Sequence, residues 1–558
     1  FDDKQTAVLI NAIDNCKILD PACGSGAFPM GILHKLVHIL HKLDPNNKLW
    51  KERQIEKAQA IEDSEIRDKL IEDIETAFES NELDYGRKLY LIENCIYGVD
   101  IQPIATQISK LRFFISLIVD QKTDKSKDNF GIRPLPNLET KFVAANTLIG
   151  IDKPKQQASL FDNPKVQALE SKLKDVRHRL FSAKTPKTKR ELREKDQKIR
   201  EDMGQILEDA GWSNESARQL ASWDLYNQNV SSGWFDSEWM FGIEDGFDVV
   251  IGNPPYVDSE TMVKNNPTLR DRLKSIYSTA KGNWDIFVVF VECGVLLSKK
   301  NGATTYIVPN KFISAKYTVD LRAFLCNYQV NELSDYSSVN VFETADVYPI
   351  VFRVTNNEFK STVKTRLMSN LCEESLCLQI DPAVFYKDIF WDKYFFNQAI
   401  TLTLIEISKF KMLKDYKFEI LGAATVNEAY QIKENIRELN NSLKEYFKLV
   451  NTGTIDPFIN KWGVKNTQYI KGSYLQPVIT KTNLNNISPK RVAQAEAEKI
   501  IVAGMTIRIE AFFDKGGYLA GKSTSIILGS DKELMALNVL LNSKILSFWF
   551  AKNYNSLS

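Results

Sequence analysis

The sequence predicts an α/β fold in which helices cover a largely parallel sheet, followed by a separate C-terminal domain of mixed helices and strands. Short apolar segments alternate with longer segments of helical periodicity, and turn-forming residues follow the apolar segments. The charge balance then changes along the chain. Residues 401–558 hold 21 Lys+Arg and 14 Asp+Glu, which leaves 51 and 57 of the chain's 72 and 71 for residues 1–400. We therefore expect the C-terminal part to have a polyanionic partner.

The first predicted strand, residues 16–20, ends at Asp20 and is followed by a turn into a helix that runs to about Leu43. The turn reads Pro21-Ala22-Cys23-Gly24-Ser25-Gly26-Ala27-Phe28. Gly24 and Gly26 allow a tight turn and the close approach of a ligand to the backbone. The helix N-terminus offers free N–H groups to a negatively charged part of that ligand. The loop is not the GxGxxG of dinucleotide-binding proteins.

The next two predicted strands end at polar residues. Residues 95–99 lead into Asp100, followed by Ile101, and residues 142–145 lead into Asn146. An acidic residue at the end of the second strand is placed to accept hydrogen bonds from ribose hydroxyls. The amide of Asn146 suits an adenine edge.

Two helical insertions interrupt the alternation of strands and helices, at about 44–90 and 150–240. The first explains why 80 residues separate the ends of the first two strands, where a minimal unit has about 20. The second carries eight basic residues between Lys184 and Arg200. This segment suits either a solvated helical hairpin or an arm that touches DNA. Charge runs are more often solvated, which favours the hairpin.

The stretch from Phe247 to Tyr256, FDVVIGNPPY, is the most informative in the chain. Its first half is a continuous β-branched segment typical of a buried strand. Its second half cannot continue a ladder, because Pro254 and Pro255 lack N–H donors and fix φ. The result is a rigid shelf at the carboxyl end of a strand, where open parallel sheets bind ligands. This shelf presents the amide of Asn253 and the ring of Tyr256.

Strands and helices continue to about residue 360. We expect a largely buried helix at 283–300, a strand at 303–308 and a strand-rich segment at 330–354, which contains Phe342 in a turn-like setting. The predicted boundaries are 1–360 for the first domain, 361–395 for a linker and 396–558 for the second domain.

Residues 457–495 in the second domain contain six basic residues and no acidic residue, with aromatic residues interleaved. This mixture suits contacts with phosphates and with the bases or sugars of a nucleic acid. A solvated basic surface explains the composition equally well. The candidate DNA contacts are Lys461, Trp462, Lys465, Lys471 and Lys481.

Other features bound the class of protein. The longest apolar segment, residues 286–297, is too short to span a bilayer and contains a glutamate, so we expect no membrane segment. Seven scattered cysteines, an odd number, favour reduced thiols in a cytoplasm over a disulfide framework. His34, His38 and His41 share a helix face, but no cysteine or carboxylate is placed to complete a metal site, so we expect none. The chain begins at Phe1 without a leader, which suggests a fragment.

These motifs, in this order, resemble the gamma-class DNA adenine-N6 methyltransferases of bacterial restriction–modification systems, including the type IIG enzymes that are fused to a nuclease. The turn after Asp20 resembles the family's S-adenosylmethionine motif, and Asn253-Pro254-Pro255-Tyr256 resembles its catalytic tetrapeptide. Residues 499–512 and 537–544 resemble a TaqI-like specificity domain. The resemblance covers nearly the whole chain.

The resemblance implies roles for particular residues. Catalysis falls to Asn253, Pro254, Pro255, Tyr256 and Phe342. Cofactor binding falls to Asp20, Pro21, Ala22, Cys23, Gly24, Gly26, Phe28, Asp100, Ile101 and Asn146. At position 146 the family commonly has Asp, and Phe342 corresponds to a second stacking aromatic.

The resemblance also implies a Rossmann-like methyltransferase sheet with helical insertions and a C-terminal α+β target recognition domain. The reaction it implies is sequence-specific methyl transfer from S-adenosylmethionine to the N6 amine of a flipped adenine in double-stranded DNA. A type IIG nuclease domain would lie upstream of this chain and is a further candidate partner. Only 17 residues precede Ile18, so we expect the upstream helical motif of the family to be mostly absent.

Three alternatives stay open. Cytosine-N4 methylation also acts on an exocyclic amine, but Asn rather than Ser at position 253, with this motif order, favours adenine. Protein glutamine methyltransferases share the NPPY tetrapeptide but are compact and need no basic tail of 158 residues. A DNA specificity module with an inactive methyltransferase fold is disfavoured by the intact motifs.

Overall fold

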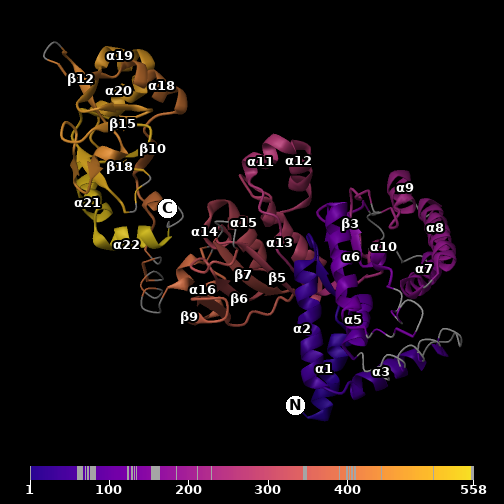
Figure 1. Cartoon of the computed structure of the whole chain (residues 1–558). Helices are drawn as coiled ribbons and strands as arrows, with labels where there is room; N and C mark the ends of the chain where they lie inside the picture. The colour runs from indigo at the N-terminus through magenta and orange to yellow at the C-terminus, as the bar shows by residue number, and fades with distance from the viewer. Residues whose placement is uncertain are drawn as a thin grey trace. The chain divides into compact units, whose positions relative to one another are not determined.

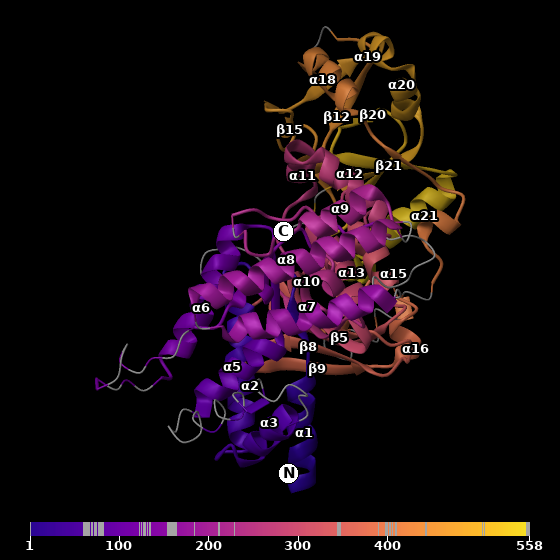
Figure 2. The same ribbon diagram turned by 90° about the vertical axis from the view of Figure 1, so that its right-hand side faces the viewer.

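The computed structural model forms two compact units, one of residues 1–312 with 316–389 and one of residues 313–315 with 390–558. The structure describes residues 2–553 apart from 60–66, 69–70, 72–74, 76–82, 122, 124, 127–129, 131, 133–134, 153–163, 184, 210–211, 228, 343–347, 389, 397–399, 401–402, 404–405, 408–409, 441–442, 505 and 507. Figures 1 and 2 show the chain from two sides.

A nine-stranded sheet forms the centre of the first unit, in the order β3-β2-β1-β4-β5-β7-β6-β8-β9 (Figure 1). Its strands are β1 (Ile18–Asp20), β2 (Ile96–Asp100), β3 (Phe142–Ala144), β4 (Phe247–Gly252), β5 (Ser298–Pro309), β6 (Gln329–Asp335), β7 (Pro349–Thr355), β8 (Val363–Met368) and β9 (Glu374–Ile380). The five strands from β3 to β5 are parallel, and β7 runs antiparallel to both β5 and β6. β1 is buried along its whole length, with two apolar residues followed by the buried Asp20. The α/β sheet predicted from the sequence is confirmed.

The strand order reverses between β1 and β4. β2 and β3 follow β1 on one side, whereas β4 and β5 lie on the other. Because crossovers between parallel strands are right-handed, this reversal puts the helices of the two halves on opposite faces of the sheet. The helices of the unit are α1 (Asp3–Asn15), α2 (Ala27–Leu43), α3 (Lys48–Gln59), α5 (Leu83–Asn94), α6 (Pro103–Ile118), α7 (Pro164–Ser182), α8 (Pro186–Asp209), α9 (Asn214–Ser222), α10 (Ser237–Phe241), α11 (Ser259–Asn265), α12 (Pro267–Ile276), α13 (Ile286–Leu297), α15 (Val319–Leu325) and α16 (Pro382–Phe385), with α14 (Lys311–Ser314) at its boundary. α2, α5 and α6 pack on β2, and the apolar α13 packs on β4 and β5.

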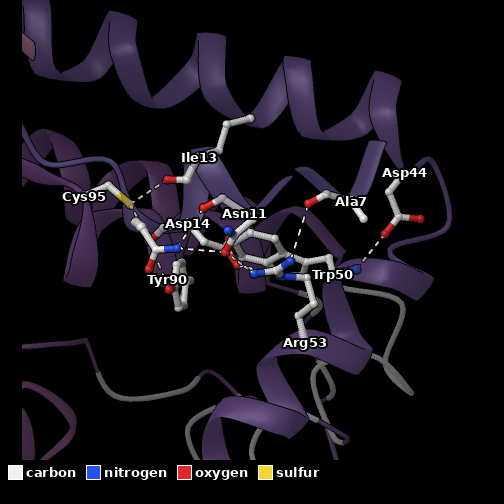
Figure 3. Close-up of polar contacts among 10 residues, drawn as sticks. Ala7, Asn11, Ile13, Asp14, Asp44, Trp50, Arg53, Tyr90 and Cys95 are labelled. Carbon is white, nitrogen blue, oxygen red and sulfur yellow. Dashed lines mark hydrogen bonds and ion pairs between the residues drawn. The ribbon is translucent and has the colours of Figure 1, made fainter. Parts of the chain in front are cut away.

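The helix α1 precedes the first strand, within the 17 residues where we expected the upstream helical motif to be mostly absent. Arg53 of α3 reaches across to α1 and donates hydrogen bonds to the carboxylate of Asp14 at 3.3 Å and to the side-chain oxygen of Asn11 (Figure 3). Asp14 is buried, and the hydroxyl of Tyr90 on α5 donates to its carbonyl at 3.2 Å. These contacts tie α1 to the two helices next to it.

The charged second insertion is a helical hairpin of α7 and α8, which pack against each other. Arg177 of α7 and Arg200 of α8 both pair with the buried carboxylate of Asp196, at 3.0 and 2.7 Å. Part of the charge in this segment is therefore used to hold its own helices together.

Residues 361–395, which the sequence suggests as a linker, instead include two strands of the sheet. β8 pairs with β6, and β9 pairs with β8 at the edge. Exposed and half-buried positions alternate along β9, which is typical of an edge strand with one solvated face. The first unit therefore extends to about residue 389. Polar and charged residues are mixed with apolar ones in both strands, so neither is a continuous apolar segment.

Among its described residues, the second unit contains two four-stranded sheets, two short hairpins, the five α-helices named below and three short 3-10 helices. The first sheet has the order β10 (Glu419–Gly422), β21 (Thr524–Leu528), β18 (Lys499–Ala503) and β19 (Ala511–Asp514). The second has the order β11 (Arg437–Glu438), β17 (Pro477–Thr480), β12 (Tyr446–Val450) and β20 (Tyr518–Ala520). The hairpins are β13 (Ile455–Asp456) with β14 (Ile459–Asn460), and β15 (Thr467–Tyr469) with β16 (Gly472–Tyr474). The helices are α18 (Val426–Asn435), α19 (Lys481–Ile487), α20 (Pro489–Glu496), α21 (Asp531–Leu541) and α22 (Lys544–Asn553).

Taken singly, no helix in the described part of the chain has the length and apolar character needed to cross a membrane. By length and composition alone, the bent pair of residues 531–541 and 544–551 passes the same test.

Candidate functional site

Four polar residues lie at or just beyond the carboxyl ends of four neighbouring parallel strands. The ends of β3, β2, β1 and β4 carry Asn146, Asp100, Asp20 and Asn253, in that spatial order. Because the strands are parallel, these four ends lie at one edge of the sheet. The edge includes the point where the strand order reverses, which is where open α/β sheets bind ligands. The structure thus brings together residues that are far apart in the sequence.

The loop from Asp20 to Phe28 is held against the end of β2 by backbone hydrogen bonds. The amide of Gly24 donates to the carboxylate of Asp100, and the amide of Cys23 donates to the carbonyl of Val99, both at 2.9 Å. Gly24 has a φ of +53°, and no heavy atom of the described chain lies within 4 Å of the place that a Cβ would take. The backbone at Gly24 therefore faces open space in which a ligand fits.

Gly26 ends the loop and is the N-cap of α2, with a φ of +83°. A Cβ at this position would lie 2.9 Å from the Oγ atom of Ser109 on α6. That hydroxyl donates to the carbonyl of Gly24 at 2.9 Å, so α6 supports the loop from behind. Both the left-handed backbone and the close approach require glycine.

Asp20 is buried behind the loop. Its carboxylate accepts a hydrogen bond from the amide of Ala22 at 3.1 Å. Burial, with a smaller contribution from the charge of Asp100, raises the pKa of Asp20 to about 8. A Cβ on Gly252 would lie 2.6 Å from the Oδ1 atom of Asp20. Since Gly252 precedes Asn253, this contact fixes the spacing between the Asp20 loop and the tetrapeptide that follows β4.

The tetrapeptide Asn253-Pro254-Pro255-Tyr256 leaves the same edge of the sheet. The Oδ1 atom of Asn253 is buried and accepts no hydrogen bond from any described residue. Pro254 is buried and Pro255 is exposed. The hydroxyl of Tyr256 donates to the carbonyl of Ile307 at 3.0 Å, and burial raises the pKa of this hydroxyl, so it stays neutral. An unsatisfied buried amide oxygen costs about 1–3 kcal/mol, which a donor on a ligand offsets.

Asp100 and Asn146 keep hydrogen-bonding capacity toward a ligand. The two carboxylate oxygens of Asp100 accept one hydrogen bond each, from the amides of Gly24 and Gln102, and a carboxylate has further lone pairs. The Oδ1 atom of Asn146 accepts from the amide of Leu148 at 3.2 Å, while its amide nitrogen donates to no residue that the structure describes. Next to Asp100, Ile101 is 56% exposed and offers an apolar surface.

Sequence reasoning missed two residues that support the loop. The hydroxyl of Thr147 donates to the carbonyl of Pro21 at 2.7 Å, and Ser109 contacts Gly26 as described above. Thr147 directly follows Asn146, so its place beyond a strand end was an available signal. Ser109 lies inside α6, where the sequence gives no such signal. The other loop residues range from buried to half-buried: Pro21, Ala22, Cys23 and Phe28.

Phe342 lies in the connection between β6 and β7 and is half-buried. β6 runs parallel to β5, because both pair antiparallel with β7. The connection therefore leaves the sheet at the same edge as the tetrapeptide after β4. Residues 343–347 lie outside the described residues, and the stacking role of Phe342 stays a prediction.

The candidate DNA contacts in the second unit differ from one another. Lys461 pairs with Asp456, and Lys481 pairs with Glu496. The indole N–H of Trp462 donates to the carbonyl of Pro477 at 2.9 Å, so this ring is partly used in packing. Two further lysines are exposed and pair with no described carboxylate: Lys465 and Lys471.

Chemically, the strand edge offers hydrogen-bond acceptors and aromatic surface. Its open acceptors are the carboxamide oxygen of Asn253 and the carboxylate of Asp100. In the described part of the chain, no group of three or more His, Cys, Asp or Glu side chains is placed to hold a metal ion. The arrangement suits a ligand that donates N–H and O–H groups.

The part of the chain that contains most of this site is similar to a known protein family. Residues 94–342 match the model of the Eco57I restriction-modification methylase family. Over these residues, which are less than half of the chain, the sequence is similar to that family. The predicted resemblance to methyltransferases of restriction–modification systems is thereby confirmed.

Two curated relatives agree with this assignment. A protein of Methanocaldococcus jannaschii, assigned as the type II restriction enzyme and methyltransferase RM.MjaORFECS2P, is 26% identical over 390 residues, which are 61% of this chain and 30% of the relative. The type II restriction enzyme and methyltransferase RM.Eco57I of Escherichia coli is 24% identical over 336 residues, which are 60% of this chain and 24% of the relative. The chain thus spans less than a third of these relatives. A solved structure of the type IIL restriction-modification enzyme MmeI with DNA has a TM-score of 0.43 and 10% identity, covering 96% of this chain and 59% of that one.

Proposed function

We propose that this chain transfers a methyl group from S-adenosylmethionine to the N6 amine of an adenine flipped out of double-stranded DNA, as the modification part of a restriction–modification enzyme. The observation that carries the proposal is the buried, unsatisfied oxygen of Asn253 at the strand edge where the Asp20 loop also begins. The family match over residues 94–342 supports a restriction–modification role.

The residues around the Asp20 loop fit S-adenosylmethionine. Open space at Gly24 leaves room for the ligand beside the backbone. The free lone pairs of Asp100 suit the two ribose hydroxyls, and the amide nitrogen of Asn146 suits a ring nitrogen of the adenine. The exposed side chain of Ile101 would pack on the adenine plane. When bound, the cofactor supplies an electrophilic methyl group on a sulfonium.

Asn253 and Pro254 act on the target amine. An exocyclic amine is a poor nucleophile because its lone pair is delocalised into the ring. The oxygen of Asn253 and the carbonyl of Pro254 accept hydrogen bonds from the two N–H groups of the target amine. These bonds hold the nitrogen closer to tetrahedral geometry, with its lone pair directed at the methyl group. Positioning and fixed dipoles supply the rate enhancement, and no strong base is required.

Tyr256 and Phe342 hold the extruded base. The target nitrogen cannot be reached inside a duplex, so the base must leave the stack. Stacking on the two rings replaces its lost neighbours and contributes about 1–3 kcal/mol per ring. The hydrogen bond from the hydroxyl of Tyr256 to Ile307 keeps that ring in a fixed orientation before the base arrives.

The second unit, in this proposal, supplies the recognition of a DNA sequence. Its excess of basic over acidic residues, 21 to 14 within residues 401–558, suits a phosphate backbone. Lys465 and Lys471 are exposed cations within the segment 457–495 that pair with no described carboxylate.

To test this function, the full chain is incubated with labelled S-adenosylmethionine and mixed-sequence DNA, and the labelled nucleoside is then identified. We expect N6-methyladenine. Asn253→Ala should lower the rate at least about 100-fold, as loss of one preorganised polar group does elsewhere, while cofactor binding persists. Asn15→Ala, at an exposed site on α1, is the control. Label in cytosine or in protein, or normal turnover by Asn253→Ala, would contradict the proposal.

A further inference from the structure

The hairpin of β15 and β16 in the second unit has one face in the core and one polar face in solvent. Thr467 and Tyr469 are buried, and Tyr469 belongs to the unit's apolar core. The strand register sets Gln468 opposite Ser473, and both are exposed. Gln468 and Asn466, which lie on the same face, donate hydrogen bonds from their amide nitrogens to the Oγ atom of Ser473 at 2.9 and 3.2 Å. Two carboxamides and a hydroxyl therefore gather on the outer face.

The turn of this hairpin is held in a conformation that its residues disfavour. Ile470 and Lys471 have φ angles of +39° and +61°. Two-residue turns of this kind normally contain Asn and Gly, and a β-branched residue at positive φ is rare. The side chain of Ile470 packs against the apolar core, and Gly472 lets the ring of Tyr474 approach to within 2.7 Å of where a Cβ would be. This packing fixes the turn and with it the backbone direction of Lys471, and such fixed strain is common at binding sites.

Positive charge flanks the polar face. Lys471 stands at the turn and Lys465 precedes the first strand, and both are exposed without a described carboxylate partner. No acidic residue occurs anywhere between residues 457 and 495. This charge complements a polyanion.

We propose that this hairpin is a ribbon that enters the major groove of DNA, with Gln468 reading a base and Lys471 contacting a phosphate. The major groove admits a two-stranded β-ribbon, and the carboxamides of Gln and Asn pair in bidentate fashion with the N6 and N7 atoms of adenine. The hydrogen bond from Gln468 to Ser473 orients the carboxamide before DNA arrives. The inference rests on the proposed DNA methylation and adds which residues read the sequence.

Methylation of a randomised DNA library by the full chain, followed by sequencing of the methylated products, tests the reading role. In Gln468→Ala we expect discrimination at one base position to fall about 10- to 100-fold, while preference at other positions is kept. The matched control is Gln431→Ala, an exposed glutamine on α18 of the same unit. An unchanged preference in Gln468→Ala, or an equal loss at all positions, would overturn the reading role. If the wild-type chain methylates no DNA, the proposed function fails instead.

Binding of the full chain to a short duplex at several salt concentrations tests the phosphate role. Lys471→Gly removes the charge and relieves the backbone strain, so a misfolded turn does not explain a loss of affinity. We expect weaker binding to all sequences and a salt slope smaller by about 1. The control is the double variant Lys274→Ala with Asp271→Asn, which removes a paired lysine of α12 without changing the net charge. Equal effects in the two proteins, or no effect of Lys471→Gly, would overturn the phosphate role.

Discussion

The strand edge of the first unit and the basic segment of the second unit differ in how their residues are positioned. At the strand edge, Asp20 and Asp100 end their strands and Asn253 directly follows β4, so the backbone places them. In the basic segment, the candidates share only their charge. Two of them, Lys461 and Lys481, are paired with Asp456 and Glu496, which flank the segment on either side. Residues tied to the ends of parallel strands are thus brought together by the fold, whereas a count of charges does not show where the charged residues lie.

The largest expected effect tests whether the two regions depend on each other. Lys499 and Asp514 form a buried ion pair in the second unit, with side chains 1% and 2% exposed. Lys499→Ala leaves the carboxylate buried and unpaired, and we expect a loss of about 3–5 kcal/mol in the free energy of unfolding of that unit. Chemical denaturation measures the loss, and equilibrium binding of S-adenosylmethionine shows whether the strand edge survives. If cofactor affinity falls together with DNA binding, the two regions are not independent.

Gly252→Ala tests the spacing on which the strand-edge site depends. The added methyl group would overlap Asp20, and overpacking of this kind costs about 1–3 kcal/mol. We expect a lower melting temperature and a loss of methyl transfer that exceeds the loss of stability, since Asn253 is displaced with the strand end. Gly422→Ala on β10 is the control, because no described heavy atom lies within 4 Å of its Cβ position. Full activity in Gly252→Ala would show that the tetrapeptide does not need this contact.

Most of the first unit's sheet and the strand-edge residues were predictable from sequence, because buried parallel strands are short apolar segments and their ends carry polar turns. Gly24, Asp100 and Asn253 are examples. β8 and β9 were not predictable in the same way, since both strands mix polar and apolar residues, and β9 is an edge strand with a solvated face. Ser109 supports the loop through tertiary contacts, which are its packing on Gly26 and its hydrogen bond to the carbonyl of Gly24.

In the second unit, the fold determines which lysines pair with a carboxylate. Lys461 pairs with Asp456 and Lys481 pairs with Glu496. The turn at Ile470 and Lys471 violates the usual turn composition, so no turn signal marks it. The composition of the segment 457–495 does not separate its paired lysines from its unpaired ones.

The pH dependence of stability in Asp20→Asn tests whether Asp20 is buried as a neutral acid at the strand edge. The folded protein holds the proton of Asp20 up to a pKa of about 8, against an ordinary value of 3.8. The stability that comes from this buried neutral acid is present below pH 4 and is lost as the pH rises toward 8. The amide carries no such titration, so the variant should gain stability relative to wild type between pH 4 and 8. One pKa unit corresponds to about 1.4 kcal/mol, so thermal unfolding at pH 5 and 8.5 resolves even part of the shift. Parallel curves for the two proteins would contradict the burial argument.

The smallest expected effect tests the basic segment. The double variant Asp456→Asn with Lys461→Ala removes an ion pair and leaves the net charge unchanged. Because the two charges largely cancel at the distance of a bound phosphate, we expect DNA affinity within about twofold of wild type and an unchanged salt slope. Lys465→Ala, which removes an unpaired exposed lysine, should weaken binding more. Titration of a fluorescent duplex with each protein measures both quantities. A salt slope that falls by about 1 in the double variant would mean that Lys461 leaves Asp456 to contact DNA, and pairing in the free protein would then be no guide to which lysines bind.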